Sequence, residues 1–137
     1  MQSIRTQRSE TRTISIAAPP RAVLDVVGDP RRFPDWAPAF ARSVRPEGDD
    51  WLVNTGAGEA RIRVVVAPEQ GTVDVLDAGR PSRGAFLRVL PNGEGSELVF
   101  TLFFPDDAAE QAIASQMATV EDELRAARSL CVPGRRG

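Results

Sequence analysis

The stretch VLPNGEGSELVFTLFF, residues 89–104, decides the fold class of this chain. From Leu98 to Phe104 every second residue is large and apolar, which places these side chains on one face of a β-strand. Asn92 and Gly93 supply the positive φ angles that a tight hairpin needs, so the residues before them are expected to pair directly with this strand. The stretch therefore predicts an antiparallel hairpin with one face turned to a core.

A single long helix is expected after this hairpin. Pro105 ends the strand, and Asp107 followed by Glu110 predicts a capping box that opens the helix. Apolar residues then recur at three- and four-residue steps up to Cys131, and Pro133 ends the pattern. Such a helix would be about 35 Å long. Because only one stripe is apolar, we expect the helix to lie across the apolar face of the sheet.

The residues before the hairpin predict a meander of further antiparallel strands. Clusters rich in Gly, Pro, Asp and Glu recur at strand spacing, and the expected strands between them are residues 51–55, 60–67, 72–76 and 85–90. Upstream, the alternating residues 11–17 predict a first strand. Pro20 and Pro30 suit the first turns of two short helices after it, with Gly28 ending one and Asp29 capping the other. We expect one α+β domain over residues 11–131, with a polar tail at 1–10 and a second tail at 132–137.

Composition limits the partners that this chain can have. The chain has 137 residues and a net charge of −2, so no global field attracts nucleic acid or an anionic membrane. It has no apolar run of about 18 residues, and its first residues lack the apolar core of a signal peptide, so we expect no integral membrane association and a cytoplasmic location. The single Cys131 has no partner for a disulfide within the chain and is interpreted as a small apolar residue.

Three residue types are absent, and each absence removes a class of chemistry. All 17 basic residues are arginine, and the sequence contains no lysine, histidine or tyrosine. A zinc or iron site of the imidazole type, a lysine Schiff base and a phenolic acid or base are therefore excluded. No Ser/His/Asp, Cys/His or metal-ligand constellation can be assembled, so we assign no catalytic residue and expect no metal and no cofactor.

Four segments carry a resemblance to a known family. They are ISIAAPP at 14–20, FPDWAP at 33–38, GTVDVLD at 71–77 and VLPNGEGSELVFTLF at 89–103. With the order of the predicted elements, they resemble the polyketide cyclase/dehydrase and lipid-transfer superfamily, often abbreviated SRPBCC, over residues 11–130. The resemblance implies a START-like helix-grip fold, in which a curved antiparallel sheet wraps around the C-terminal helix and encloses a cavity. Ala78 stands where a histidine tends to follow the Leu-Asp pair in one bacterial branch, which weakens any transferred enzymatic mechanism.

Within that fold, eleven residues are the candidates for the wall of a ligand cavity. They are Trp36, Trp51, Val64, Val75, Arg88, Phe100, Leu102, Ile113, Gln116, Met117 and Val120. For each apolar residue, ordinary packing in a filled core is the alternative. Arg88 faces the cavity if Phe86 and Leu90 point inward, and solvent if Leu87 does. Gln116 either offers a polar contact inside the cavity or lies at its boundary.

Three functions are compatible with these observations. The first is binding of a small hydrophobic or aromatic molecule between sheet and helix, as a carrier, sensor or sequestering protein. The second is an enzyme of the polyketide cyclase/dehydratase type, in which cavity shape and proximity dominate the catalysis. The third is an interaction or homodimerisation module with a filled interior. An inward carboxylate or arginine with a strongly perturbed pKa would favour the second.

Overall fold

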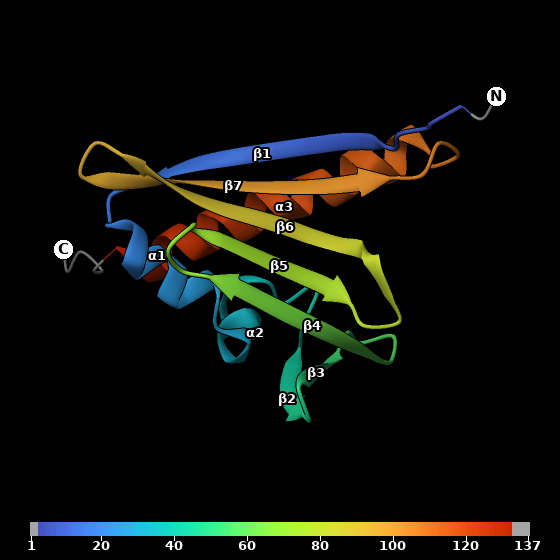
Figure 1. Cartoon of the computed structure of the whole chain (residues 1–137), viewed down its shortest axis with the longest axis horizontal. Helices are drawn as coiled ribbons and strands as arrows, with labels where there is room; N and C mark the ends of the chain where they lie inside the picture. Colours follow the sequence, from blue (N-terminus) through green and yellow to red (C-terminus); the bar gives the residue numbers. More distant parts are fainter. Residues whose placement is uncertain (1–2, 133–137) are drawn as a thin grey trace.

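The computed structural model describes residues 3–132, and within them one seven-stranded antiparallel sheet curves over a long helix (Figure 1). The elements follow the chain as β1 (Arg8–Ile16), α1 (Pro20–Val27), η1 (Pro30–Arg32), α2 (Phe33–Trp36), β2 (Ser43–Glu47), β3 (Asp50–Asn54), β4 (Glu59–Ala67), β5 (Thr72–Asp77), β6 (Arg80–Asn92), β7 (Gly95–Phe104) and α3 (Glu110–Cys131). The strand order is β1-β7-β6-β5-β4-β3-β2. This is the expected helix-grip architecture, in which α3 lies against the concave face of the sheet.

The hairpin of β6 and β7 forms as the alternation of residues predicts. Leu98 pairs with Val89 and Phe100 with Leu87, and all four side chains are buried on the concave face. The turn differs from the prediction by one residue: Asn92 still pairs with Gly95, so the loop is Gly93 and Glu94, and Gly93 takes a φ of 59°. Only a residue that tolerates a left-handed backbone fits there.

Strand boundaries depart from the sequence analysis in three main places. The first is β6, which runs over Arg80–Asn92 rather than residues 85–90. The other two lie at the edges of the sheet. β1 begins at Arg8, where an irregular tail was expected up to residue 10, because residues 8–10 pair with the end of β7. β2 was not predicted at all. Its sequence SVRPE holds Pro46 and two charged residues, and it occupies the edge of the sheet, where such residues are tolerated.

The short helices after β1 follow the predicted signals. Pro20 opens α1, and Gly28 ends it with its N–H donating to the Leu24 carbonyl. The Asp29 side chain accepts a hydrogen bond from the Arg31 N–H at 3.0 Å and so caps η1. Both α1 and α2 contact α3, and in Figure 1 they lie beside its C-terminal half.

The predicted capping box of α3 does not form. The helix begins at Glu110 with Ala109 as its N-cap, and no side chain caps it. The helix starts two residues later than the box requires, so Glu110 is its first residue rather than its third. The Glu110 carboxylate accepts a hydrogen bond from the Arg8 guanidinium at 2.5 Å. The apolar stripe is otherwise as expected, with Ile113, Met117, Val120, Leu124 and Ala127 buried.

A seam of ion pairs joins β1 to one side of α3. Arg8 bonds to Glu10 and Glu110, while Arg12 bonds to Glu10 at 3.2 Å and to Glu121 at 3.1 Å. We call these five residues the β1–α3 seam. Within the sheet, α3 makes most of its contacts with β1, and fewer with β7. The concave faces of β4, β5 and β6 are therefore left for other groups to cover.

Between residues 3 and 132, none of the helices combines the length and apolar character needed to span a bilayer. In the same part of the chain, no group of three or more His, Cys, Asp or Glu side chains is placed to hold a metal ion.

Candidate functional site

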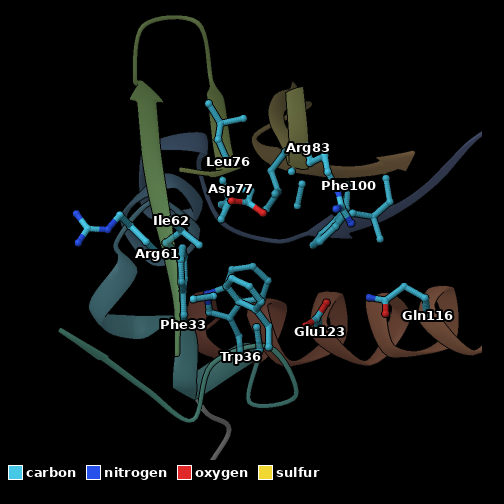
Figure 2. Close-up of a pocket in the computed structure, with 18 residues that line it drawn as sticks. Phe33, Trp36, Arg61, Ile62, Leu76, Asp77, Arg83, Phe100, Gln116 and Glu123 are labelled. Carbon is cyan, nitrogen blue, oxygen red and sulfur yellow. The ribbon is translucent and has the colours of Figure 1, made fainter. Parts of the chain in front are cut away.

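A cavity of about 300 Å³ lies between α3 and the concave face of the sheet (Figure 2). Its floor is α3, its ceiling is the concave face of β4 to β7, and its end wall is the α2 region. Most of the lining is apolar and consists of Phe33, Trp36, Ala37, Phe40, Ala60, Ile62, Val75, Leu76, Ala85, Leu87, Phe100 and Leu102. Small residues in the ceiling, such as Ala60 and Ala85, leave the space that larger side chains would fill.

The end wall is aromatic. Phe33 and Trp36 are three residues apart on the single turn of α2, so both rings point to the same side. They meet edge to face with centroids 5.8 Å apart, and Phe40 follows at 6.0 Å from Phe33. Phe33 and Trp36 are almost fully buried. The indole Nε1–H of Trp36 is closed off from solvent and has no hydrogen-bond acceptor among the residues that the structure describes.

Glu123 brings a carboxyl group into this apolar space. It lies on α3, only 6% exposed, and Figure 2 shows it rising from the helix into the cavity between Trp36 and Gln116. Within residues 3–132, no side chain or backbone group hydrogen-bonds to it and no arginine pairs with it. Burial, together with the negative charge of the adjacent Asp122, raises the pKa of Glu123 to about 7. The group is therefore poised to exchange a proton near neutrality.

The rim of the cavity carries further charges. Asp77 and Arg83 come from the β5–β6 hairpin, where the strand register shifts between Leu76 and Asp77. The Asp77 carboxylate accepts a hydrogen bond from the Gly79 N–H at 2.9 Å, which fixes the hairpin turn. Arg61 contributes to the lining, but Figure 2 shows its side chain directed away from the cavity, where the guanidinium pairs with Glu47.

The chain matches a family model over residues 7–128, described as polyketide cyclase / dehydrase and lipid transport. The chain belongs to this family. Three solved structures share the fold: the protein XoxI from Bacillus cereus, the Aha1 dimer from Colwellia psychrerythraea and a START superfamily protein from Mycobacterium smegmatis.

The likeness to these structures extends over nearly whole chains. XoxI has a TM-score of 0.71 at 20% identity and covers 88% of this chain and 93% of its own. Aha1 has a TM-score of 0.70 at 13% identity and covers 91% of this chain and 97% of its own. The START protein has a TM-score of 0.67 at 13% identity and covers 88% of this chain and 94% of its own. At such identities the likeness concerns the fold alone. The search among curated proteins found no match.

In this polyketide cyclase/dehydrase family member, five of the eleven predicted residues line the cavity: Trp36, Val75, Phe100, Leu102 and Gln116. Three others belong to the centre of the α3 stripe. Ile113, Met117 and Val120 are at most 4% exposed. They pack in the hydrophobic core and do not line the cavity, because the middle of the stripe lies against other core side chains. The cavity is reached from the edge of the stripe, which holds Gln116 and Glu123.

The remaining three predicted residues lie elsewhere for individual reasons. Arg88 is exposed on the convex face of the sheet, because Leu87 and Val89 take the inward positions of β6. Trp51 is half-buried away from the cavity, with the Arg31 guanidinium 4.9 Å from its ring centroid. Val64 points inward from β4 but packs against the core rather than facing the cavity.

Glu123 is the site residue that the sequence analysis missed. It stands in the acidic run Glu121-Asp122-Glu123, which is typical of a solvated helix face. The signal that could have found it is its spacing. Glu123 lies three residues after Val120 and seven after Gln116, which places it on the border of the apolar stripe.

Proposed function

We propose that this protein binds a small hydrophobic or aromatic molecule in the cavity beside α3, as a carrier, sensor or sequestering protein. The observation that carries the proposal is a cavity of about 300 Å³ with an aromatic end wall and an aliphatic ceiling. This volume is at the lower end of the range for small-molecule sites. The SRPBCC/START-like fold generally binds hydrophobic ligands, which supports the same function.

The affinity would come mainly from burial of apolar surface, at about 25 cal/mol per Å². A compact one- or two-ring molecule fits such a space better than a long acyl chain. The rings of Phe33 and Phe100 approach the cavity from different elements, so a flat guest would contact aromatic surface on more than one side.

The test is to fill the cavity and measure what is lost. Ala85→Phe adds a ring to the ceiling, and we expect binding of naphthylmethanol, measured by isothermal titration calorimetry, to weaken at least about tenfold while the chain stays folded. Ala114→Phe is the matched control, because Ala114 is exposed on α3 and does not line the cavity. Equal affinities of the two variants, or no binding of any compound from a panel of neutral aromatic and aliphatic alcohols to the wild type, would contradict the proposal.

A second candidate function is an enzyme of the cyclase/dehydratase type, and Glu123 is the observation that favours it. A carboxyl with a pKa of about 7 can accept and return a proton at neutral pH. In a dehydration, the Glu123 carboxylate would remove the proton on the carbon next to a ligand carbonyl and return it to the departing β-hydroxyl. The products would be an unsaturated carbonyl compound and water.

This second function is tested by incubating the protein with an aromatic β-hydroxyketone and following the absorbance of the conjugated product. We expect a rate above background that Glu123→Gln abolishes and Glu121→Gln leaves unchanged. A wild-type rate equal to the buffer rate would remove the case for this enzyme. Self-association stays a separate prediction, to be checked by light scattering, and the cavity itself argues against a filled interior.

A further inference from the structure

We infer that the ligand of this cavity is a hydrophobic amine, whose ammonium group pairs with the Glu123 carboxylate and lies against the aromatic end wall of Phe33, Trp36 and Phe40. The inference rests on the proposed binding function and names the chemical class of its ligand. It follows from three features: an unpaired buried carboxyl, the rings beside it, and the position of the arginines.

The first feature is the lack of a counter-ion for Glu123. In the described chain, seven of the other 18 acidic residues are paired with arginine, including Glu10, Glu121, Asp50 and Asp122. Glu123 is more deeply buried than any of these four, and yet it has no such partner among residues 3–132. A buried carboxylate without a partner is costly, and a ligand cation would remove that cost on binding.

The second feature is the composition of the wall next to this carboxyl. Trp and Phe rings attract a cation placed over their faces within about 6 Å of the centroid, and the attraction is strongest where water is excluded. Phe33, Trp36 and Phe40 form one continuous cluster with centroid separations of 5.8 Å and 6.0 Å. Aromatic faces next to one carboxylate suit an ammonium group that carries apolar substituents.

The third feature is the distribution of the other charges around the cavity. Asp122 precedes Glu123 on α3, and Asp77 lies at the rim, so both add negative charge. Arg61 directs its guanidinium outward to Glu47. Arg83 is the one arginine of the described residues at the rim, opposite α3 and next to Asp77 on an exposed hairpin. An anionic ligand would meet like charge at the cavity floor. A neutral alcohol would leave the carboxylate without a cation.

Binding of an amine is also coupled to protonation. The ammonium pairs with the ionised carboxylate, whereas the free protein holds a proton on Glu123 up to a pH of about 7. An aliphatic amine, like a lysine side chain, stays charged over this range. The affinity should therefore rise between pH 6 and pH 8, and binding near pH 6 should release a proton from the protein.

The experiment compares probes that share one apolar body and differ in their polar group. Naphthylmethylamine, naphthylmethanol and naphthoic acid are titrated into the wild-type chain at pH 8 and at pH 6 by isothermal titration calorimetry. We expect the amine to bind about tenfold or more tightly than the alcohol at pH 8, the effect of one charge-assisted hydrogen bond. We expect the acid to bind more weakly than either.

Two variants show whether Glu123 is responsible. Glu123→Gln should reduce the preference for the amine to within about twofold and remove its pH dependence, while binding of the alcohol persists. Glu121→Gln removes the same charge two residues away, on the side of α3 that faces β1, and should keep the preference. It is therefore the matched control.

The outcomes separate this inference from the function on which it rests. If the alcohol binds but the amine binds no better, the ligand class is wrong and the binding function stands. If the acid binds best, the exposed Arg83 governs recognition and the inference fails. If none of the three probes, nor any other neutral compound, binds the wild type, then the binding function itself fails.

Discussion

Glu121 and Glu123 lie two residues apart on α3 and have opposite surroundings. The Glu121 side chain is 47% exposed and accepts a hydrogen bond from Arg12 across the β1–α3 seam. The Glu123 residue is 6% exposed and faces an apolar cavity with no partner in the described chain. On one side of α3 the carboxylate is thus paired with an arginine, while on the other side the carboxyl has no partner among residues 3–132.

The difference between the two glutamates indicates which polar groups have partners within the chain and which one is available to a ligand. A polar group that has found its partner within the chain holds elements together and has nothing left to offer a ligand. A buried carboxyl without a partner is the rarer case, and it lowers stability unless something else compensates for it. The seam is therefore interpreted as structural and the cavity side as functional.

The largest effect on stability is expected from removing a ring of the aromatic end wall of the cavity. Phe33→Ala removes a ring that is 1% exposed and holds the end wall together, so we expect the free energy of unfolding to fall by about 3–5 kcal/mol. Phe103→Ala is the control, because Phe103 is 47% exposed on the convex face and should cost less than about 1 kcal/mol. Denaturant titration of both variants measures the difference, and equal losses would show that the end wall is not part of the core.

The next effect is a gain of stability that depends on pH. The folded state raises the pKa of Glu123 from 4.5 to about 7, so the folded chain binds more protons between these values. Stability from this group is present below pH 4.5 and is lost as the pH rises to 7. Glu123→Gln has no ionisable group at this position and does not lose this stability. At pH 8 we expect its free energy of unfolding to exceed that of the wild type by about 3 kcal/mol.

The same comparison at pH 4 is the control, because Glu123 is then protonated in the folded chain and resembles glutamine. Thermal unfolding at the two pH values gives both differences. A variant that is no more stable than the wild type at pH 8 would mean that the carboxyl is better solvated than its burial indicates.

The smallest effect is expected on the seam. Arg12→Gln and Glu121→Gln each remove one partner of an exposed ion pair, and such pairs contribute little to stability because water and salt screen them. A double-mutant cycle followed by denaturant titration should give a coupling that disappears at high salt. A coupling that persists at high salt would show that the seam is shielded, and the contrast between the two sides of α3 would weaken.

Much of the fold could be predicted because its elements follow simple periods. The alternation in β7 and the three- and four-residue steps of α3 each identified the face that is buried. The prediction that failed was the start of α3, which begins at Glu110 rather than directly after Asp107. At this start the Glu110 carboxylate bonds to Arg8. Such a contact between residues far apart in sequence leaves no local pattern.

The site was less predictable than the fold, for a physical reason. Periodicity locates the centre of an apolar stripe, and the centre is where packing is tightest, so Met117 and Val120 have no free space beside them. A cavity opens where packing stops, at the edge of the stripe, and there polar residues such as Gln116 and Glu123 occur. The sequence analysis included Gln116 among its candidates but missed Glu123, whose acidic neighbours are typical of a solvent-facing helix surface.

Because one of the two tryptophans lies in the cavity wall and the other lies outside it, intrinsic tryptophan fluorescence can report on ligand binding. The chain has two tryptophans and no tyrosine, so its intrinsic indole fluorescence arises from Trp36 and Trp51 alone. Trp36 belongs to the end wall, whereas Trp51 lies under Arg31 outside the cavity. Trp51→Phe would leave a single emitter in contact with any guest, and its intensity or colour would register occupancy without a label.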